Sequence, residues 1–351
     1  MSVRFSVLDL APVVSGSTSG QALRNTLDLA RHVERLGFHR YWLAEHHAMP
    51  GIASSATAVL IGQVAAATAT MRVGSGGVML PNHAPMVVAE QFGTLEALYP
   101  GRIDLGLGRA PGTDQATALA LRRSPEALSV DDFPEQVIEL RGYFGADSKV
   151  TPAAGNEPPV WLLGSSGYSA RLAGLLGLPF AFAHHFSAQN TVPALNLYRE
   201  SFRPGALDEL VPCGGTTPHT PRNRPYSMIG VSVTAADTDA HAEELARPQA
   251  LAFLRLRRGT PGLLPTPEET AAYPYTPMDR QMIDSRLADQ VIGGPETVRA
   301  KLDALIGRTG VDEVMVTTQV FDHADRLRSY DILADLYKED LAPGDAAASG
   351  A

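Results

Sequence analysis

The stretch that decides the fold is RVGSGGVMLPNHAPMVVAEQFGTLEALYPGRIDLGLGR, residues 72–109. It begins with an apolar run at 72–80 and ends with a second one at 102–109, and both are typical of buried strands. Between them, apolar residues recur at three- and four-residue spacing over 85–99, which predicts a helix. Two apolar strands joined by a helix indicate a parallel sheet that is covered by helices.

The same alternation extends in both directions along the chain. Further strands are predicted at 5–10, 41–47, 159–166, 179–186, 226–235 and 313–320, and further helices at 23–37, 54–69, 169–177 and 295–310. The runs at 72–80 and 102–109 bring the number of strands to about eight, which favours closure into an α/β fold of the (β/α)8 TIM-barrel type. We expect one barrel domain over residues 1–341, because such barrels often exceed 250 residues.

Two segments interrupt this rhythm. Residues 204–225 are rich in Pro, Gly and Thr, and residues 259–280 hold five prolines. Both are interpreted as insertions at the C-terminal rim of the barrel, where they would form lids or subunit contacts. The last residues, 342–351, are predicted to be a disordered tail.

Composition excludes several classes of protein. The net charge of −9 argues against affinity for nucleic acid or for an anionic membrane surface. The single cysteine, Cys213, excludes a disulfide within the chain and is interpreted as a neutral loop residue. The N-terminal segment has no signal-peptide pattern, and no apolar run is long enough to span a membrane, so a cytoplasmic location is expected.

Polar groups gather where the predicted strands end. Asp9 ends the first strand, Glu45-His46-His47 the second, Arg109 the fourth, a Gly-Ser loop the fifth and His184-His185 the sixth. The C-terminal ends of barrel strands carry the active site, because the loops there converge on the barrel opening. We therefore expect these residues to line one face.

A phosphate site is predicted from two neighbouring strand ends. The segment GSSGYSA, 164–170, is a strand–turn–helix sequence whose Ser hydroxyls and free backbone N–H groups suit an anion. An ordinary helix cap explains it equally well when it is considered alone. Arg109 favours the phosphate, because a guanidinium at the end of the adjacent strand supplies a permanent charge and planar donors.

The histidines are candidates for acid–base chemistry. His46 and His47 would lie on opposite faces if their strand continued, which weakens a two-histidine metal site, and no metal is expected. A histidine of near-neutral pKa suits proton transfer or the stabilisation of an oxyanion. At His184 and His185, a packed and hydrogen-bonded role is an equally good interpretation.

The pair Gly76-Gly77 lies inside an apolar strand. Glycine weakens a strand, so its presence usually marks a bulge or the close approach of another group. A flat ring stacked on the backbone would need no side chain there, and a cis peptide would be tolerated. Bending at a barrel corner is the structural alternative.

Three segments together carry a family resemblance: EHH at 45–47, the stretch 74–112, and PVWLLGSSGYSARLAGLLGLP at 159–179. They resemble the bacterial luciferase-like flavin monooxygenases, and most closely the luciferase-family oxidoreductases of group 1, from about residue 3 to about residue 340. The resemblance implies a barrel that binds reduced FMN (FMNH2), usually supplied by a separate flavin reductase. It also implies a C4a-peroxyflavin that oxidises a small organic substrate with O2, and commonly a homodimer.

Site residues follow from the resemblance position by position. His46, with His47 beside it, is the acid–base candidate, and Gly76-Gly77 matches a non-prolyl cis peptide that supports the isoalloxazine ring. Arg109 matches the arginine that grips the FMN phosphate. The remaining cofactor-binding candidates, from the phosphate loop and its surroundings, are Leu163, Gly164, Ser165, Ser166, Gly167, Ser169 and His184.

Two departures from the luciferase α chain argue against light emission. Gly108 stands where that chain has a reactive cysteine, and Ser165 stands where it has a glutamate. Three alternative functions remain open at this point: an F420-dependent oxidoreductase on the same barrel, a flavin-binding protein without catalysis, and a flavin-free barrel hydrolase that uses Asp9 and Glu45. The sequence does not identify the organic substrate.

Overall fold

The structure is a computed structural model that describes residues 3–110, 115–122, 132–212 and 223–341. The predictions for Cys213 and for the tail at 342–351 lie outside these residues, as does part of the segment 204–225. No helix in the described part of the chain has both the length and the apolar character needed to cross a bilayer.

The chain is divided into two compact units, and strands β2 and β8 each run from one unit into the other. Unit 1 comprises residues 1–41, 50–53 and 231–351, and unit 2 comprises residues 42–49 and 54–230. A single domain over 1–341 stays a prediction.

The parallel sheet of unit 2 carries the residues of interest. It contains the end of β2 (Arg40–Leu43), β3 (Arg72–Ser75), β4 (Val78–Met79), β5 (Ile103–Gly108), β6 (Val160–Gly164), β7 (Phe180–Phe182) and the start of β8 (Ser227–Ala235). Both β3 and β4 pair with β5, so the predicted strand at 72–80 is interrupted at Gly76-Gly77. Gly108 is the register partner of Leu163, which places the ends of β5 and β6 side by side.

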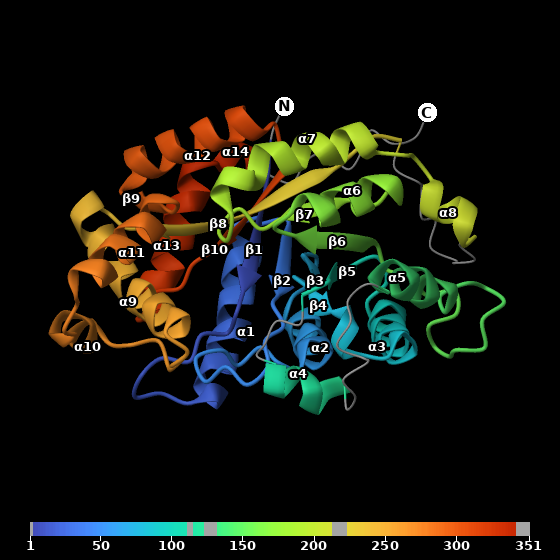
Figure 1. The fold of residues 1–351 in the computed structure, drawn as a ribbon, viewed down its shortest axis with the longest axis horizontal. Helices are drawn as coiled ribbons and strands as arrows, with labels where there is room; N and C mark the ends of the chain where they lie inside the picture. Colours follow the sequence, from blue (N-terminus) through green and yellow to red (C-terminus); the bar gives the residue numbers. More distant parts are fainter. Residues whose placement is uncertain (1–2, 111–114, 123–131, 213–222, 342–351) are drawn as a thin grey trace. The chain divides into compact units, whose positions relative to one another are not determined.

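Helices cover the outer face of this sheet (Figure 1). They include α2 (Thr57–Ala67), α3 (Pro85–Leu98), α5 (Phe133–Gly142), α6 (Gly167–Leu175) and α7 (Thr191–Ser201), while α4 (Gln115–Arg122) and α8 (Ala206–Leu210) complete the set. Trp42 and Trp161 are fully buried in the core of the unit, with ring centroids 5.2 Å apart. The indole of Trp42 donates to Asp104 at 3.0 Å, so the polar N–H of this large core residue is satisfied.

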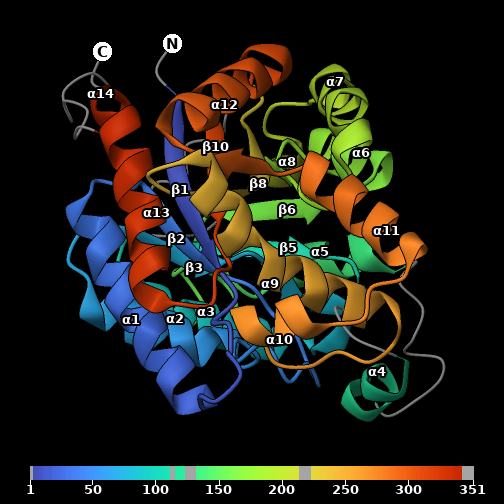
Figure 2. The same ribbon diagram turned by 90° about the vertical axis from the view of Figure 1, so that its left-hand side faces the viewer.

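In unit 1, β1 (Arg4–Asp9) pairs in parallel with β10 (Glu313–Thr317), and β8 pairs with β9 (Val291–Gly293). Figure 2 shows α13 (His323–Leu336) running beside α1 (Ser19–Arg35). The helices α12 (Pro295–Thr309) and α14 (Lys338–Leu341) also pack in this unit. β10 also pairs with β8, so the strand order β10-β1-β2-β3-β5-β6-β7-β8 returns to its start. The fold is therefore a (β/α)8 barrel, as predicted.

The segment 259–280 of unit 1 is more regular than its prolines indicate. After α9 (Asp239–Arg257) it forms α10 (Pro267–Ala272) and the beginning of α11 (Pro277–Ala288). Thr266 with Glu269, and Thr276 with Asp279, make capping boxes in which each side chain bonds to the backbone of the other. The motifs TPEE and TPMD carry this signal in the sequence, with proline at the first helical position.

Candidate functional site

The candidate site lies at the C-terminal ends of the unit 2 strands. The predicted strand at 41–47 is too long, because β2 ends at Leu43. Ser54 accounts for the ending: its hydroxyl donates to the carbonyl of Ala44, and its own carbonyl accepts from the backbone N–H of His46 at 3.1 Å. The residues 45–47 therefore lie outside the sheet, and the argument that strand alternation separates His46 from His47 does not apply.

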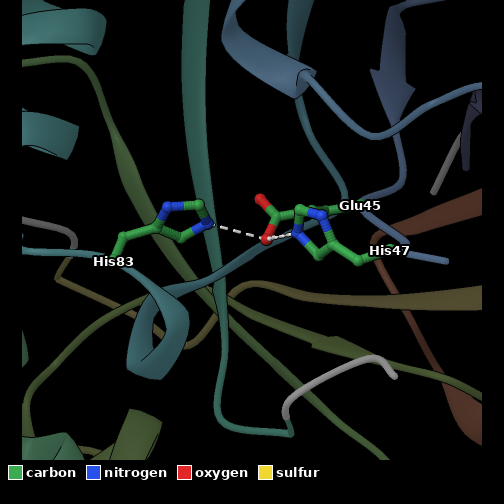
Figure 3. A group of neighbouring side chains, drawn as sticks. All are labelled: Glu45, His47 and His83. Atoms are coloured by element: carbon green, nitrogen blue, oxygen red, sulfur yellow. Dashed lines mark hydrogen bonds and ion pairs between the residues drawn. The ribbon is translucent and has the colours of Figure 1, made fainter. Parts of the chain in front are cut away.

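Glu45 is held between two histidines (Figure 3). One carboxylate oxygen, Oε1, lies 3.0 Å from Nε2 of His47 and 2.8 Å from Nε2 of His83. Burial by itself would raise the pKa of Glu45, but the hydrogen bonds and charges of the two imidazoles outweigh it and lower the pKa. Glu45 is therefore ionised at neutral pH.

Sequence reasoning missed His83. It follows the short 3-10 helix η1 (Leu80–Asn82), and its backbone N–H donates to the carbonyl of Leu80 at 2.9 Å. The residue is part of the stretch 74–112 quoted for the family resemblance, but it ends no strand. The signal was a histidine in a short connection directly after strand β4, on the side where active-site residues gather.

Two histidines and a carboxylate are also ligand types for transition metals. The three ligand atoms of Glu45, His47 and His83 lie within 4.8 Å of one another. Direct hydrogen bonds already account for both short distances in the group, and we interpret it as a hydrogen-bonded cluster.

The structure brings Arg109 and the Gly-Ser loop together. The guanidinium carbon of Arg109 lies 4.1 Å from the centroid of the Tyr168 ring, in the first turn of α6. No carboxylate pairs with Arg109 among the residues the structure describes. The cation therefore stands at a helix N-terminus with its charge available to an anion.

The N-terminus of α6 presents donors to the same place. Ser166 is the N-cap, with no hydrogen bond from its side chain to the helix. The first intrahelical bond runs from the N–H of Ala170 to Ser166 at 3.4 Å, which leaves the preceding N–H groups of the helix available. Ser165 is exposed, whereas Ser169 is buried.

Two glycines are explained by local packing. At Gly164, a Cβ would collide with the side chain of Ser169, so only glycine lets α6 start this close to β6. At Gly77, a Cβ would lie 2.7 Å from the carbonyl oxygen of Gly106 on the neighbouring strand. The peptide bond between Gly76 and Gly77 is cis, as predicted. Gly76 is only partly buried.

Other predicted residues have mainly structural surroundings. His184 is buried, with Nδ1 2.7 Å from the hydroxyl of Thr191, and Nδ1 of His185 lies 2.8 Å from the carbonyl of Gly230. Both agree with the packed, hydrogen-bonded interpretation, and the role of His184 in cofactor binding stays a prediction. Leu163 lies at the end of β6, where its backbone pairs with β5.

Asp9 does not offer a free carboxylate. It is fully buried in unit 1, and Arg326 donates to it at 2.6 Å, Thr26 at 2.7 Å and Tyr41 at 2.5 Å. Burial would raise the pKa of Asp9, but the charge of Arg326 and these hydrogen bonds lower it overall. The expectation that Asp9 is part of the functional face is therefore wrong, because its oxygens are occupied by a structural network.

Comparison with known proteins shows the family of the chain. The family described as luciferase-like monooxygenase matches residues 3–313. A luciferase-like monooxygenase of Escherichia coli (strain K12) is 48% identical over 342 residues, covering 96% of this chain and 98% of the relative. An N-acetyl-S-alkylcysteine monooxygenase of Bacillus subtilis (strain 168) is 32% identical, covering 95% of this chain and 98% of the relative.

Solved structures agree on the fold. The crystal structure of apo-MsnO8 is 38% identical and covers 97% of this chain and 99% of its own, with a TM-score of 0.84. Two more distant structures share the fold alone. The first is an FMN complex of a type II Baeyer-Villiger monooxygenase from Pseudomonas putida, 19% identical with a TM-score of 0.68, which covers 98% of this chain and 99% of its own. The second is an F420-dependent secondary alcohol dehydrogenase, 15% identical with a TM-score of 0.65, which covers 96% of this chain and 98% of its own.

The chain belongs to the luciferase-like monooxygenase family, as the resemblance implied, and it is an enzyme of the monooxygenase class. A monooxygenase of this family acts on a small molecule together with O2.

Proposed function

We propose that this chain is an FMN-dependent monooxygenase that uses reduced flavin and O2 to oxidise a small organic substrate. The single observation that carries the proposal is the position of Arg109 against the first turn of α6, 4.1 Å from the Tyr168 ring. A cation without a carboxylate partner among the described residues, next to a helix N-terminus with exposed Ser165, fits a terminal phosphate.

The other site residues have distinct roles in this proposal. Arg109, Ser165, Ser166, Gly167 and Ser169 bind the phosphate group. Leu163 and Gly164 form the wall beside it, and the backbone at Gly76 faces the isoalloxazine ring, since this position has no side chain. Bound reduced flavin supplies the electrons that activate O2. His46 and His47 hold and move protons at the reacting end.

FMN is preferred to F420 because the Arg109 cation beside the N-terminus of α6 suits the terminal phosphate that FMN carries. The test is an anaerobic titration of the flavin-free protein with FMNH2, and separately with reduced F420, followed by mixing with O2. We expect saturable binding of FMNH2 at one site per chain, and flavin oxidation whose kinetics differ from those of free FMNH2. Binding of F420 but not of FMNH2 would overturn the proposal.

We also propose that the chain forms a homodimer through α2 and α3. The exposed side of these neighbouring helices carries four large apolar residues, 42–67% exposed: Val59, Met86, Val87 and Leu98. α2 contains no charged residue at all. Large apolar side chains that gather on an exposed helix pair favour an interface with another chain.

Two further parts of the proposal rest on the sequence analysis. A separate flavin reductase supplies the reduced flavin, and the enzyme acts in the cytoplasm. Co-purification or kinetic coupling with a flavin reductase, and fractionation of the producing cells, test these two statements.

A further inference from the structure

The cluster of Glu45, His47 and His83 places one buried carboxylate against two more exposed imidazoles. Flavin binding alone does not explain this arrangement. Glu45 is 2% exposed, whereas His47 and His83 are 15% and 28% exposed. A buried carboxylate thus lies behind two imidazoles that solvent or a ligand can reach. Figure 3 shows the two rings approaching the carboxylate from different sides.

Hydrogen-bond chemistry determines where the protons are. An ionised carboxylate only accepts hydrogen bonds, and a neutral imidazole has one N–H donor and one acceptor nitrogen. Because Nε2 of each ring lies within 3.0 Å of Glu45 Oε1, both rings must carry their proton on Nε2. In this tautomer Nδ1 carries no proton, so it is the ring atom that acts as the base.

Both rings are held by their own chain segments. The segment that carries Glu45 and His47 is tied to Ser54 through the N–H of His46, and His83 is tied to Leu80. These backbone bonds hold the two segments, and the Glu45 carboxylate bridges them by accepting a hydrogen bond from each ring. Its position is therefore determined by both histidines together.

We propose that Glu45 and His83 are positioning residues for His47, so that Glu45 orients the His47 ring as its Nε2–H tautomer while the second hydrogen bond, from His83, holds the carboxylate in place. The inference rests on the proposed function, in which His47 moves a proton. A proton taken up at Nδ1 of His47 creates an imidazolium beside an ionised carboxylate, which stabilises it, and the same proton is later released from Nδ1. A carboxylate paired with a histidine has this orienting role in other enzymes.

The first test measures tautomers in the flavin-free protein, by NMR of 15N-histidine. In the wild type, His47 and His83 are expected as Nε2–H tautomers. In Glu45→Gln, which keeps the shape but removes the charge, His47 should become a mixture of both tautomers. An unchanged His47 tautomer would overturn the proposal, and this readout does not depend on flavin binding.

The second test measures FMNH2 affinity and the rate at which O2 oxidises bound FMNH2 to FMN, with H2O2 as the other product. We expect Glu45→Gln and His83→Ala to keep the FMNH2 affinity within about twofold. Both should slow oxidation by about tenfold or more, which is less than the rate lost when an acid–base group itself is removed. His83→Gln, which keeps an N–H donor, should recover most of the rate.

A matched control is His32→Ala. His32 also donates to a carboxylate, Asp331 at 2.7 Å, but on helices α1 and α13 of unit 1. Its oxidation rate should equal that of the wild type. Failure of the wild type to bind FMNH2 would reject the proposed function, whereas normal binding with unchanged rates in both cluster variants would reject only the positioning role. Stoichiometric Zn2+ binding that is lost in Glu45→Gln would show that the cluster is a metal site and would also overturn the proposal.

Discussion

The guanidinium carbon of Arg109 lies 4.1 Å above the ring of Tyr168, so the end of β5 and the start of α6 form one surface. The two residues are far apart in the sequence, and the register of Gly108 with Leu163 brings them together. The contact orients the cation without neutralising it, because an aromatic ring attracts a cation but contributes no formal charge. An anion that reaches this surface meets the full charge of the arginine.

Arg109→Ala should weaken FMN binding by about 2 kcal/mol, roughly 30-fold in Kd, through loss of a charge-assisted contact to the phosphate. Calorimetric titration of the flavin-free protein measures this change. The control is Arg171→Ala, an exposed arginine later in the same helix α6, which should bind like the wild type. Equal affinities for Arg109→Ala and the wild type would remove the phosphate assignment.

His46→Ala should bind FMN within about twofold of the wild type but slow the oxygen-dependent step by about 100-fold or more, the size of an acid–base contribution. Rapid mixing of the FMNH2 complex with O2 gives the rate, and a separate titration gives the affinity. A variant that reacts as fast as the wild type would refute the acid–base role of His46.

Loss of the buried ion pair between Asp9 and Arg326 should destabilise unit 1 far more than loss of an exposed ion pair. Arg326→Met leaves a buried carboxylate without its cation and is expected to lower the free energy of unfolding by about 3–5 kcal/mol. Arg328→Met is the control on the same helix, because its pair with Asp237 has side chains 49% and 69% exposed. The control should change stability by less than about 0.5 kcal/mol. Urea denaturation at pH 7 compares the two, and similar losses would contradict the network.

The same pair should make stability depend on pH in a definite direction. The pKa of Asp9 is lowered in the folded protein, so its contribution is present above the usual aspartate pKa near 3.8 and is lost as the pH falls through the folded value. Wild-type stability should therefore decline below about pH 4, and the decline should be smaller in Arg326→Met. An equal decline in both proteins would show that other carboxylates are responsible.

Leu98→Lys should convert the proposed homodimer into monomers, since Leu98 is 65% exposed on α3 and a buried lysine without a partner is strongly unfavourable. Light scattering after gel filtration measures the mass. As a control on another helix, Leu256→Lys replaces a leucine that is 44% exposed on α9 and should leave the mass unchanged. A wild type that is monomeric would contradict the dimer directly.

Helices and strands were predictable where apolar residues recur at regular spacing, because that spacing reflects which side chains are buried. The predicted helix at 85–99 and the observed α3 at Pro85–Leu98 differ by one residue, and β5 lies within the predicted run. Strand ends were less predictable. β2 ends at Leu43 because Ser54, which is distant in the sequence, takes the hydrogen bonds of the following residues.

The candidate site was predictable where a residue follows a strand directly. Arg109 directly follows β5 and the loop at 164–170 begins at the end of β6, as the sequence predicted, while their role in binding stays a prediction. His83 was missed because its role depends on a carboxylate 38 positions earlier, which no local pattern reports. The prediction for Asp9 was wrong for the converse reason. Asp9 ends a strand, but its carboxylate accepts a hydrogen bond from Arg326, 317 positions later in the chain.

A crystal structure of the protein soaked with FMN shows where the phosphate binds and therefore tests the role of Arg109. We expect the phosphate to be bound by the Arg109 guanidinium and by the N–H groups at the start of α6, with the ring over Gly76. FMN bound with its phosphate elsewhere, or an Arg109 side chain that points away from the bound nucleotide, would contradict this expectation.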